Sequence, residues 1–177
     1  MGQSLTWLRP HFERIMEEYW QTTQLAYRLY PQRQSISYDD VGTAIQRLLG
    51  DRPDVSIRRL DLAYSSYPKA IFEEIIQADR TNLTMPWPER NDCDNYGWRF
   101  KCNMDFFFNA DAVGFVLDES AWHAYNLIVL PDLTAELFEP QQDRFVALDE
   151  PIVIPGGVPL AGLSTGRYSL TKGLIII

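Results

Sequence analysis

Residues 92–117, DCDNYGWRFKCNMDFFFNADAVGFVL, decide the fold, because the spacing of the apolar side chains changes within this stretch. Its first half repeats large apolar residues at helical spacing, among them Phe100 and Phe107, and Asp92 before them is a favourable helix N-cap. In its last six residues the apolar side chains run together, as they do in a buried strand. We therefore predict a helix over residues 93–108, followed directly by a strand.

The rest of the chain shows the same order of elements, with predicted helices mostly before this stretch and predicted strands mostly after it. Helices are predicted over residues 5–29, 38–49 and 69–78, and strands over residues 54–62, 112–117, 124–130, 135–138, 145–148 and 169–177. This order is typical of an α+β fold, here with N-terminal helices packed on a C-terminal antiparallel β-sheet. At 177 residues the chain is expected to form a single domain (1–177), with residues 1–50 as a helical N-terminal extension.

The composition is that of a globular protein, and it disfavours some classes of binding partner. Hydrophobic residues make up 46% of the chain and aromatic residues 13%, which is enough to build a core without disulfides. The net charge of −8 disfavours nucleic acid as a partner, because phosphate binding needs a surplus of lysine and arginine. No apolar run is long enough to span a bilayer, so no membrane partner is expected.

The N-terminus and the two cysteines bear on the cellular compartment. Residues 1–7 lack the basic patch and apolar core of a signal peptide, which predicts a protein that is cytoplasmic or released without a signal peptide. Cys93 and Cys102 are too few for a disulfide framework or a four-cysteine zinc site, so free thiols in a reducing compartment are expected. Within the predicted helix, Cys102 is expected to be a small buried apolar residue.

Cys93 falls in the first turn of the predicted helix, where a thiol can be activated. Helix N-termini carry partial positive charge, which favours a thiolate, and their backbone N–H groups can hold an oxyanion. Asp92 and Asp94 on either side oppose the thiolate, and the sequence leaves this balance open. Cys93 is therefore a candidate nucleophile.

His123 and Glu139 supply the other groups that thiol chemistry needs. His123 begins an alternating segment, and Glu139 follows sixteen residues later at the end of the next predicted strand. Antiparallel neighbours bring such residues side by side, so Glu139 is expected to accept from the imidazole and fix its tautomer. Gln141 points to the same face if the strand continues past Pro140. A buried free cysteine and a structural histidine would explain the same residues without any catalysis.

The segment from about Met85 to Asp143 resembles the papain-like cysteine-peptidase domain found at the C-terminus of mushroom agglutinins. The resemblance is carried by WPERNDCDNY at residues 87–96, HAYN at residues 123–126 and LFEPQQD at residues 137–143. It covers about a third of the chain, and it implies a papain-like form of the α+β fold.

The resemblance also implies roles for individual residues. It places the nucleophile at Cys93, the general base at His123 and the orienting carboxylate at Glu139, with Gln141 as a polar active-site position beside that carboxylate. Papain itself has a glutamine six residues before its cysteine that helps to form the oxyanion hole. This chain has Trp87 at that position, so an indole N–H would have to take the place of the glutamine.

Two tryptophans next to the motif residues are candidates for substrate binding. Trp87 and Trp122 lie close in sequence to Cys93 and His123, and an aromatic-walled cleft would explain them. Ordinary packing would explain them equally well.

Calcium is a further implication, since the agglutinin peptidase that the chain resembles requires it. Acidic residues do surround the motif, but they lack the regular spacing of a calcium-binding loop, and a solvated acidic face is expected instead. No metal ligand is assigned. The acidic residues are Asp92, Asp94, Asp105, Asp111, Asp118 and Glu119.

The first hypothesis is a papain-like cysteine hydrolase, a peptidase that acts on a peptide or protein substrate through a Cys–His–Glu triad and an acyl-enzyme. One alternative is a catalytically inactive papain-like interaction module, motivated by the missing upstream glutamine and by the acidic neighbours of Cys93. The other is a transglutaminase-like acyl transferase, which passes the acyl group to an amine. The sequence leaves the substrate and the oligomeric state open.

Overall fold

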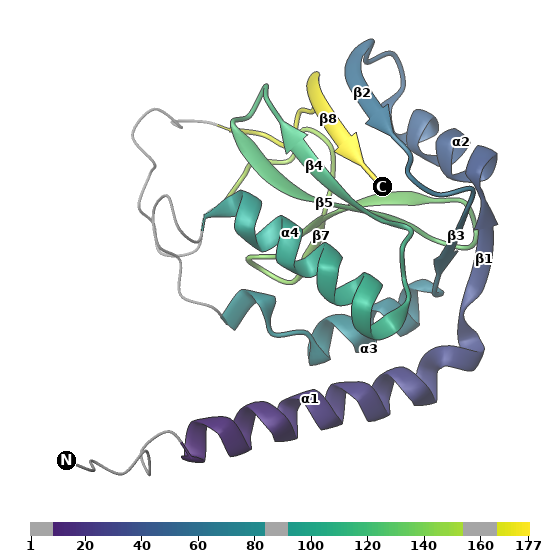
Figure 1. The fold of residues 1–177 in the computed structure, drawn as a ribbon. Helices are drawn as coiled ribbons and strands as arrows, with labels where there is room; N and C mark the ends of the chain where they lie inside the picture. Colours follow the sequence, from purple (N-terminus) through teal and green to yellow (C-terminus); the bar gives the residue numbers. More distant parts are fainter. Residues whose placement is uncertain (1–8, 84–91, 154–165) are drawn as a thin grey trace.

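A computed structural model of the chain describes residues 9–83, 92–153 and 166–177 (Figure 1). Its helices are α1 (Arg9–Leu29), α2 (Tyr38–Leu49), α3 (Lys69–Ala78) and α4 (Cys93–Asn103), with short helical turns at η2 (Tyr30–Gln32), η3 (Thr81–Leu83) and η4 (Met104–Phe108). Its strands are β1 (Gln34–Ser37), β2 (Asp54–Arg58), β3 (Ala63–Ser66), β4 (Val113–Asp118), β5 (His123–Val129), β6 (Ala135–Glu139), β7 (Arg144–Val146) and β8 (Lys172–Ile176).

Two sheets organise the chain. A six-stranded sheet has the order β2-β8-β4-β5-β6-β7, and β1 pairs with β3 in a separate two-stranded sheet. The large sheet is antiparallel except for the parallel pair β2 and β8. The predicted α+β class is confirmed. The short strands β1 and β3 were not predicted, because four residues carry too little periodicity to distinguish a strand from a loop.

Helices cover both faces of the large sheet, which places its strands between two hydrophobic cores. On one face α2 packs on the sheet, with Ile45 in the same core as Leu127. On the other face α3 and α4 pack, with Phe100 in the same core as Ile128 and stacked on the ring of Phe138 at 4.5 Å. Figure 1 shows α4 running alongside β4 and β5. The sheet and α4 therefore form the frame on which the candidate site is built.

The N-terminal helix α1 lies apart from the sheet and packs on η4 and α3 (Figure 1). The ring of Tyr19 meets that of Phe107 with their centroids 5.5 Å apart. Much of the predicted apolar stripe remains exposed, as at Phe12 (63%) and Trp20 (57%). The prediction of one domain with an extension over residues 1–50 stays a prediction. The structure adds that α2, which lies within those residues, belongs to the core. No described helix is long and apolar enough to cross a membrane.

Local capping explains why two of the helices begin where the sequence predicted. Ser37 Oγ accepts a hydrogen bond from the Asp40 N–H (3.1 Å) and starts α2. At α4 the Asp92 side chain accepts from the backbone of Asn95, whose own side chain accepts from the Asp92 N–H at 3.3 Å. This reciprocal capping box fixes Cys93 as the first residue of α4.

Gly97 allows α4 to approach the sheet closely. A Cβ atom at this position would lie 3.0 Å from Phe115 Cε2 and 3.5 Å from the Tyr125 carbonyl oxygen. The Gly97 carbonyl also accepts a hydrogen bond from Asn126 Nδ2 at 2.9 Å. Glycine has a low helix propensity, so its presence inside a helix needs a structural reason. Here the reason is the close packing of the helix on the sheet, which leaves no room for a side chain.

We predict that Gly97→Ala lowers the free energy of unfolding by about 1–3 kcal/mol, because the new methyl group overpacks the contact with Phe115 and outweighs the better helix propensity of alanine. Urea denaturation measures this change. Cys102→Ala, at an exposed position of the same helix, is the control and should leave stability nearly unchanged. Equal stability of Gly97→Ala and the control would contradict the close approach.

Candidate active site

Cys93 is a free, partly buried thiol at the first position of α4. Asn126 of β5 holds the first turns of this helix in place, since its Nδ2 donates to the Gly97 carbonyl (2.9 Å) and to the Gly114 carbonyl (3.1 Å). The backbone N–H groups of a first helical turn have no carbonyl partner within their own helix. The thiol therefore lies at the positive end of a helix that is anchored to the sheet.

His123 and Glu139 form a buried hydrogen-bonded pair between neighbouring strands. The register sets Asn126 of β5 opposite Phe138 of β6, so the next pair places Tyr125 opposite Glu139, with His123 two residues further on the same face. His123 Nε2 lies 2.6 Å from Glu139 Oε2, and the two side chains are only 5% and 1% exposed. Adjacent strands thus bring together the imidazole and the carboxylate, as their spacing led us to expect.

Cys93 completes this arrangement, because its side chain lies close enough to the imidazole of His123 to favour its protonated form. Burial alone would lower the pKa of His123. The hydrogen bonds to Cys93 and Glu139, and the negative charges of these two groups, outweigh burial and raise the pKa of His123 from 6.5 to about 9. At neutral pH the imidazole is therefore protonated between two acidic partners.

The carboxylate of Glu139 has two further donors. The hydroxyl of Tyr168 donates to Oε2 at 3.0 Å, and the backbone N–H of Gln141 donates to Oε1 at 3.0 Å. Every oxygen of this buried group is therefore hydrogen-bonded, and its orientation toward His123 is fixed from several directions.

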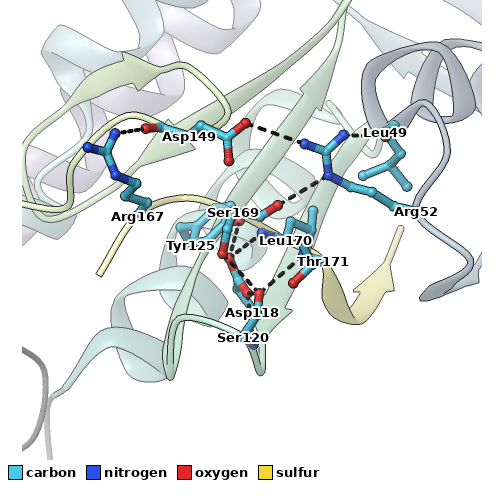
Figure 2. Close-up of polar contacts among 10 residues, drawn as sticks. All are labelled: Leu49, Arg52, Asp118, Ser120, Tyr125, Asp149, Arg167, Ser169, Leu170 and Thr171. Carbon is cyan, nitrogen blue, oxygen red and sulfur yellow. Dashed lines mark hydrogen bonds and ion pairs between the residues drawn. The ribbon is translucent and has the colours of Figure 1, made fainter. Parts of the chain in front are cut away.

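Asp118 at the end of β4 anchors the turn that leads into His123 (Figure 2). Its Oδ1 accepts from the Ser120 hydroxyl (2.5 Å) and from the backbone N–H groups of Ser120 (3.0 Å) and Ala121 (3.1 Å). Its Oδ2 accepts from the Tyr125 hydroxyl (3.1 Å) and the Leu170 N–H (2.9 Å). The expectation that Asp118 belongs to a solvated acidic face is wrong, because this carboxylate is completely buried and its charge is satisfied by five donors.

The remaining predicted site residues are placed as follows. Trp122 is 82% exposed beside His123 and has a positive φ of 51°, an uncommon backbone conformation for a bulky residue. Gln141 contacts the site through its backbone N–H. Trp87 lies outside the described residues.

Cys102 is exposed, so its predicted burial is wrong. Phe100 and Met104 in the same stretch are the residues that point into the core, and Cys102 midway between them lies on the other side of the helix.

The described residues present no cluster suited to calcium. Within residues 9–83, 92–153 and 166–177, no three His, Cys, Asp or Glu side chains lie together so as to hold a metal ion. Five of the acidic residues named above have protein partners instead: Asp92 and Asp118 as described, Asp105 with Lys101 at 3.2 Å, Asp111 with the backbone N–H of Ser65, and Glu119 with Lys172 at 2.7 Å. No chemical step is therefore assigned to calcium.

Sequence reasoning missed Tyr168 and Tyr125, the two tyrosines that surround the pair. Their rings meet edge to face at 5.2 Å, and both lie within 6 Å of the His123 ring. Tyr125 lies two residues after His123, so strand alternation alone places it on the same face. Tyr168 is 29 residues beyond Glu139, and no local pattern connects the two.

The fold is similar to that of a mushroom lectin. A structure described as the PSL1a–E64 complex matches with a TM-score of 0.58 and 22% sequence identity, over 82% of this chain and 52% of that chain. A structure of Polyporus squamosus lectin bound to the human-type influenza-binding epitope Neu5Aca2-6Galb1-4GlcNAc matches with a TM-score of 0.48 and 21% identity, over 81% and 49%. This chain therefore spans about half the length of those proteins. The fold similarity agrees with the resemblance to mushroom agglutinins.

Sequence comparison finds no matching family model and no matching curated protein.

We predict that stability falls as the pH rises from about 6.5 to about 9. Unfolded His123 has an ordinary pKa near 6.5, whereas the folded protein holds this proton more tightly, up to about pH 9. The stabilisation from protonated His123 is therefore complete below pH 6.5 and is lost as the pH passes 9. Urea unfolding across this range measures the decline. The His123→Gln variant should lack the contribution of this proton, and an equal decline in both proteins would contradict the raised pKa.

Proposed function

We propose that this protein is a papain-like cysteine hydrolase that cleaves peptide bonds in a peptide or protein substrate. The observation that carries the proposal is the buried His123, which hydrogen-bonds Glu139 at 2.6 Å and whose protonated form is also favoured by the adjacent side chain of Cys93. This is the order of contacts that thiol catalysis uses, in which a nucleophile meets a base and the base meets an orienting group.

In the first half of the proposed reaction the Cys93 thiolate attacks the carbonyl carbon of the peptide bond. The C–S bond forms as the carbonyl π electrons move to oxygen, which gives a tetrahedral oxyanion. The C–N bond then breaks, and the His123 imidazolium gives its proton to the departing amine. The products of this half are a free amine and a thioester on Cys93, with His123 neutral.

In the second half the neutral His123 takes a proton from water, whose oxygen attacks the thioester carbon. The C–S bond breaks, the substrate acid leaves, and the thiolate–imidazolium pair of Cys93 and His123 is restored. Glu139 keeps the imidazole in one orientation throughout and stabilises its charged form.

Stabilisation of the oxyanion is proposed to come from the start of α4. The backbone N–H of Cys93 lies in the first helical turn, where donors are available and the helix dipole favours negative charge. The side chain of Gln141 and the indole of Trp87 remain proposals for additional donors.

The structural neighbour supports the proposal of thiol chemistry at Cys93. Its description names a complex with E64, an epoxide reagent that alkylates nucleophilic thiolates. At 22% identity the similarity itself establishes only the fold, and the transfer of thiol reactivity to Cys93 belongs to the proposal.

A non-catalytic interaction module is the second candidate, and a specific observation favours it. The helix α1 leaves large apolar side chains exposed, among them Phe12 (63%), Trp20 (57%) and Tyr27 (74%). Contiguous exposed apolar surface is a common mark of protein–protein contact. The two functions are separated by whether Cys93 supports turnover.

We predict that E-64 forms one covalent adduct with the protein, and that Cys93→Ala abolishes this adduct. Among the described side chains Cys93 is the thiol that adjoins an imidazole, so Cys93 is expected to be the residue that opens the epoxide. The mass of the intact protein measures the adduct. Cys102→Ala is the matched control, because Cys102 is the more exposed thiol but lies away from His123, and this variant should retain the adduct.

The same variants test turnover on a peptide library. Cys93→Ala should lower the rate by about a thousandfold or more, while Cys102→Ala leaves it unchanged. Absence of any Cys93-dependent hydrolysis would overturn the hydrolase and favour the interaction module. Addition of a primary amine tests the transglutaminase-like alternative, since an amide product with that amine would show acyl transfer in place of hydrolysis.

We predict that Trp122→Ala raises KM several-fold and leaves kcat nearly unchanged. The exposed indole beside His123 is proposed to contact substrate away from the reacting bond, and such binding affects KM more than kcat. Tyr27→Ala removes a similarly exposed ring from α1 and is the control. An unchanged KM for Trp122→Ala would remove this residue from the substrate site.

A further inference from the structure

The hydroxyl of Tyr168 and the imidazole of His123 meet the same oxygen of Glu139. Tyr168 Oη lies 3.0 Å from Oε2, and His123 Nε2 lies 2.6 Å from it. Tyr168 is completely buried, so its hydroxyl is shielded from bulk solvent. Burial, followed by the nearby charge of Glu139, raises the pKa of Tyr168, and the phenol therefore stays neutral and donates at any pH at which a protein works.

The segment that carries Tyr168 is held on its N-terminal side by a short backbone ladder. The Tyr168 N–H donates to the Glu150 carbonyl (3.1 Å), and the Tyr168 carbonyl accepts from the Asp149 N–H (3.1 Å). Next to it, the Arg167 side chain donates to the Asp149 carbonyl at 2.5 Å (Figure 2). These contacts fix the backbone from which the tyrosine ring projects.

On its C-terminal side the same segment is held by three residues from distant regions of the chain (Figure 2). Arg52 Nε donates to the Ser169 carbonyl at 3.2 Å. Asp118 accepts from the Leu170 N–H (2.9 Å), and Ser120 Oγ accepts from the Thr171 N–H at 3.1 Å. Leu170 adopts a positive φ of 39°, an uncommon conformation that these contacts maintain. The backbone of Tyr168 is thus held on both sides, and this directs its hydroxyl toward Glu139.

We propose that Tyr168 is a positioning residue of the catalytic site, which holds Glu139 in the rotamer that faces His123 and withdraws some of its charge. This inference rests on the proposed function. A hydrogen bond to the carboxylate disperses its negative charge, so Glu139 attracts the imidazolium less strongly. In the second half of the reaction His123 has to act as a neutral base, and Tyr168 would favour that form. Glu139 alone would hold the proton too tightly.

The groups that contact the His123 imidazole or affect its protonation come from each element around it. They are Cys93 from α4, Tyr125 from the same strand, Glu139 from β6 and Tyr168 from the segment before β8, with Arg144 and Glu150 acting on Tyr168 from further away. Tyr125 supplies a matched comparison, because its ring packs against both Tyr168 and His123 but its hydroxyl bonds Asp118.

The test compares Tyr168→Phe with Tyr125→Phe by NMR titration of the His123 imidazole. Each variant keeps its ring and loses one buried hydroxyl. Tyr168→Phe should raise the pKa of His123 by roughly 0.5–1 unit and should slow hydrolysis of the acyl-enzyme about tenfold. Tyr125→Phe should shift the His123 titration much less. No shift in Tyr168→Phe, or an equal shift in both variants, would overturn the inference.

A double-variant cycle asks whether Tyr168 acts through Glu139. In the Glu139→Gln background the charge is gone, so adding Tyr168→Phe should change the His123 titration no further. An undiminished effect in that background would contradict the positioning role. If Tyr168→Phe does not fold, the exchange of the Tyr168 hydroxyl proton is measured in tyrosine-labelled protein. It should become faster in Glu139→Gln, and unchanged exchange would overturn the inference.

These readouts separate the two proposals. The NMR titration needs no turnover, so a shift confined to Tyr168→Phe supports the positioning role even if no substrate is hydrolysed and the hydrolase proposal fails. Conversely, Cys93-dependent hydrolysis with the same His123 titration in Tyr168→Phe and wild type would leave the hydrolase intact and overturn the role of Tyr168.

Discussion

The carboxylate of Glu139 is almost completely buried and accepts hydrogen bonds from His123, Tyr168 and the backbone of Gln141. A buried charge without partners costs several kcal/mol or more, so these donors are a condition for folding as well as for the geometry of the site. They come from β5, from the segment before β8 and from the turn after β6. Three separate segments of the chain must therefore be in place before the imidazole is oriented toward Cys93.

Asp118, at the end of β4, has a comparable role. Its carboxylate accepts hydrogen bonds from the turn that leads into His123, from the segment that follows Tyr168 and from the hydroxyl of Tyr125. The two buried carboxylates thus hold the two tyrosines, one each, whose rings pack against the His123 ring. Because fully paired buried polar networks are rigid, this arrangement leaves the imidazole few alternative orientations.

Local chemistry made some of this architecture predictable. Asp92 caps α4 and so places Cys93 at its start, and the strand spacing placed His123 beside Glu139. Predictions failed where a residue's surroundings come from distant elements. Cys102 was assigned to the core although it faces solvent, and Asp118 was assigned to solvent although it is buried, because a sequence gives helix phase and polarity but not what covers each face.

The sequence by itself determined the α+β class, the start of α4 and the candidate roles of Cys93, His123 and Glu139, because these depend on periodicity, on capping and on the pairing of neighbouring strands. Only the tertiary structure decided which groups surround them. Tyr168 reaches Glu139 from 29 residues away, and β2 pairs with β8 across most of the chain. Such contacts form because burying a charge or a strand edge requires a partner, and the partner is chosen by the packed fold rather than by proximity in the sequence.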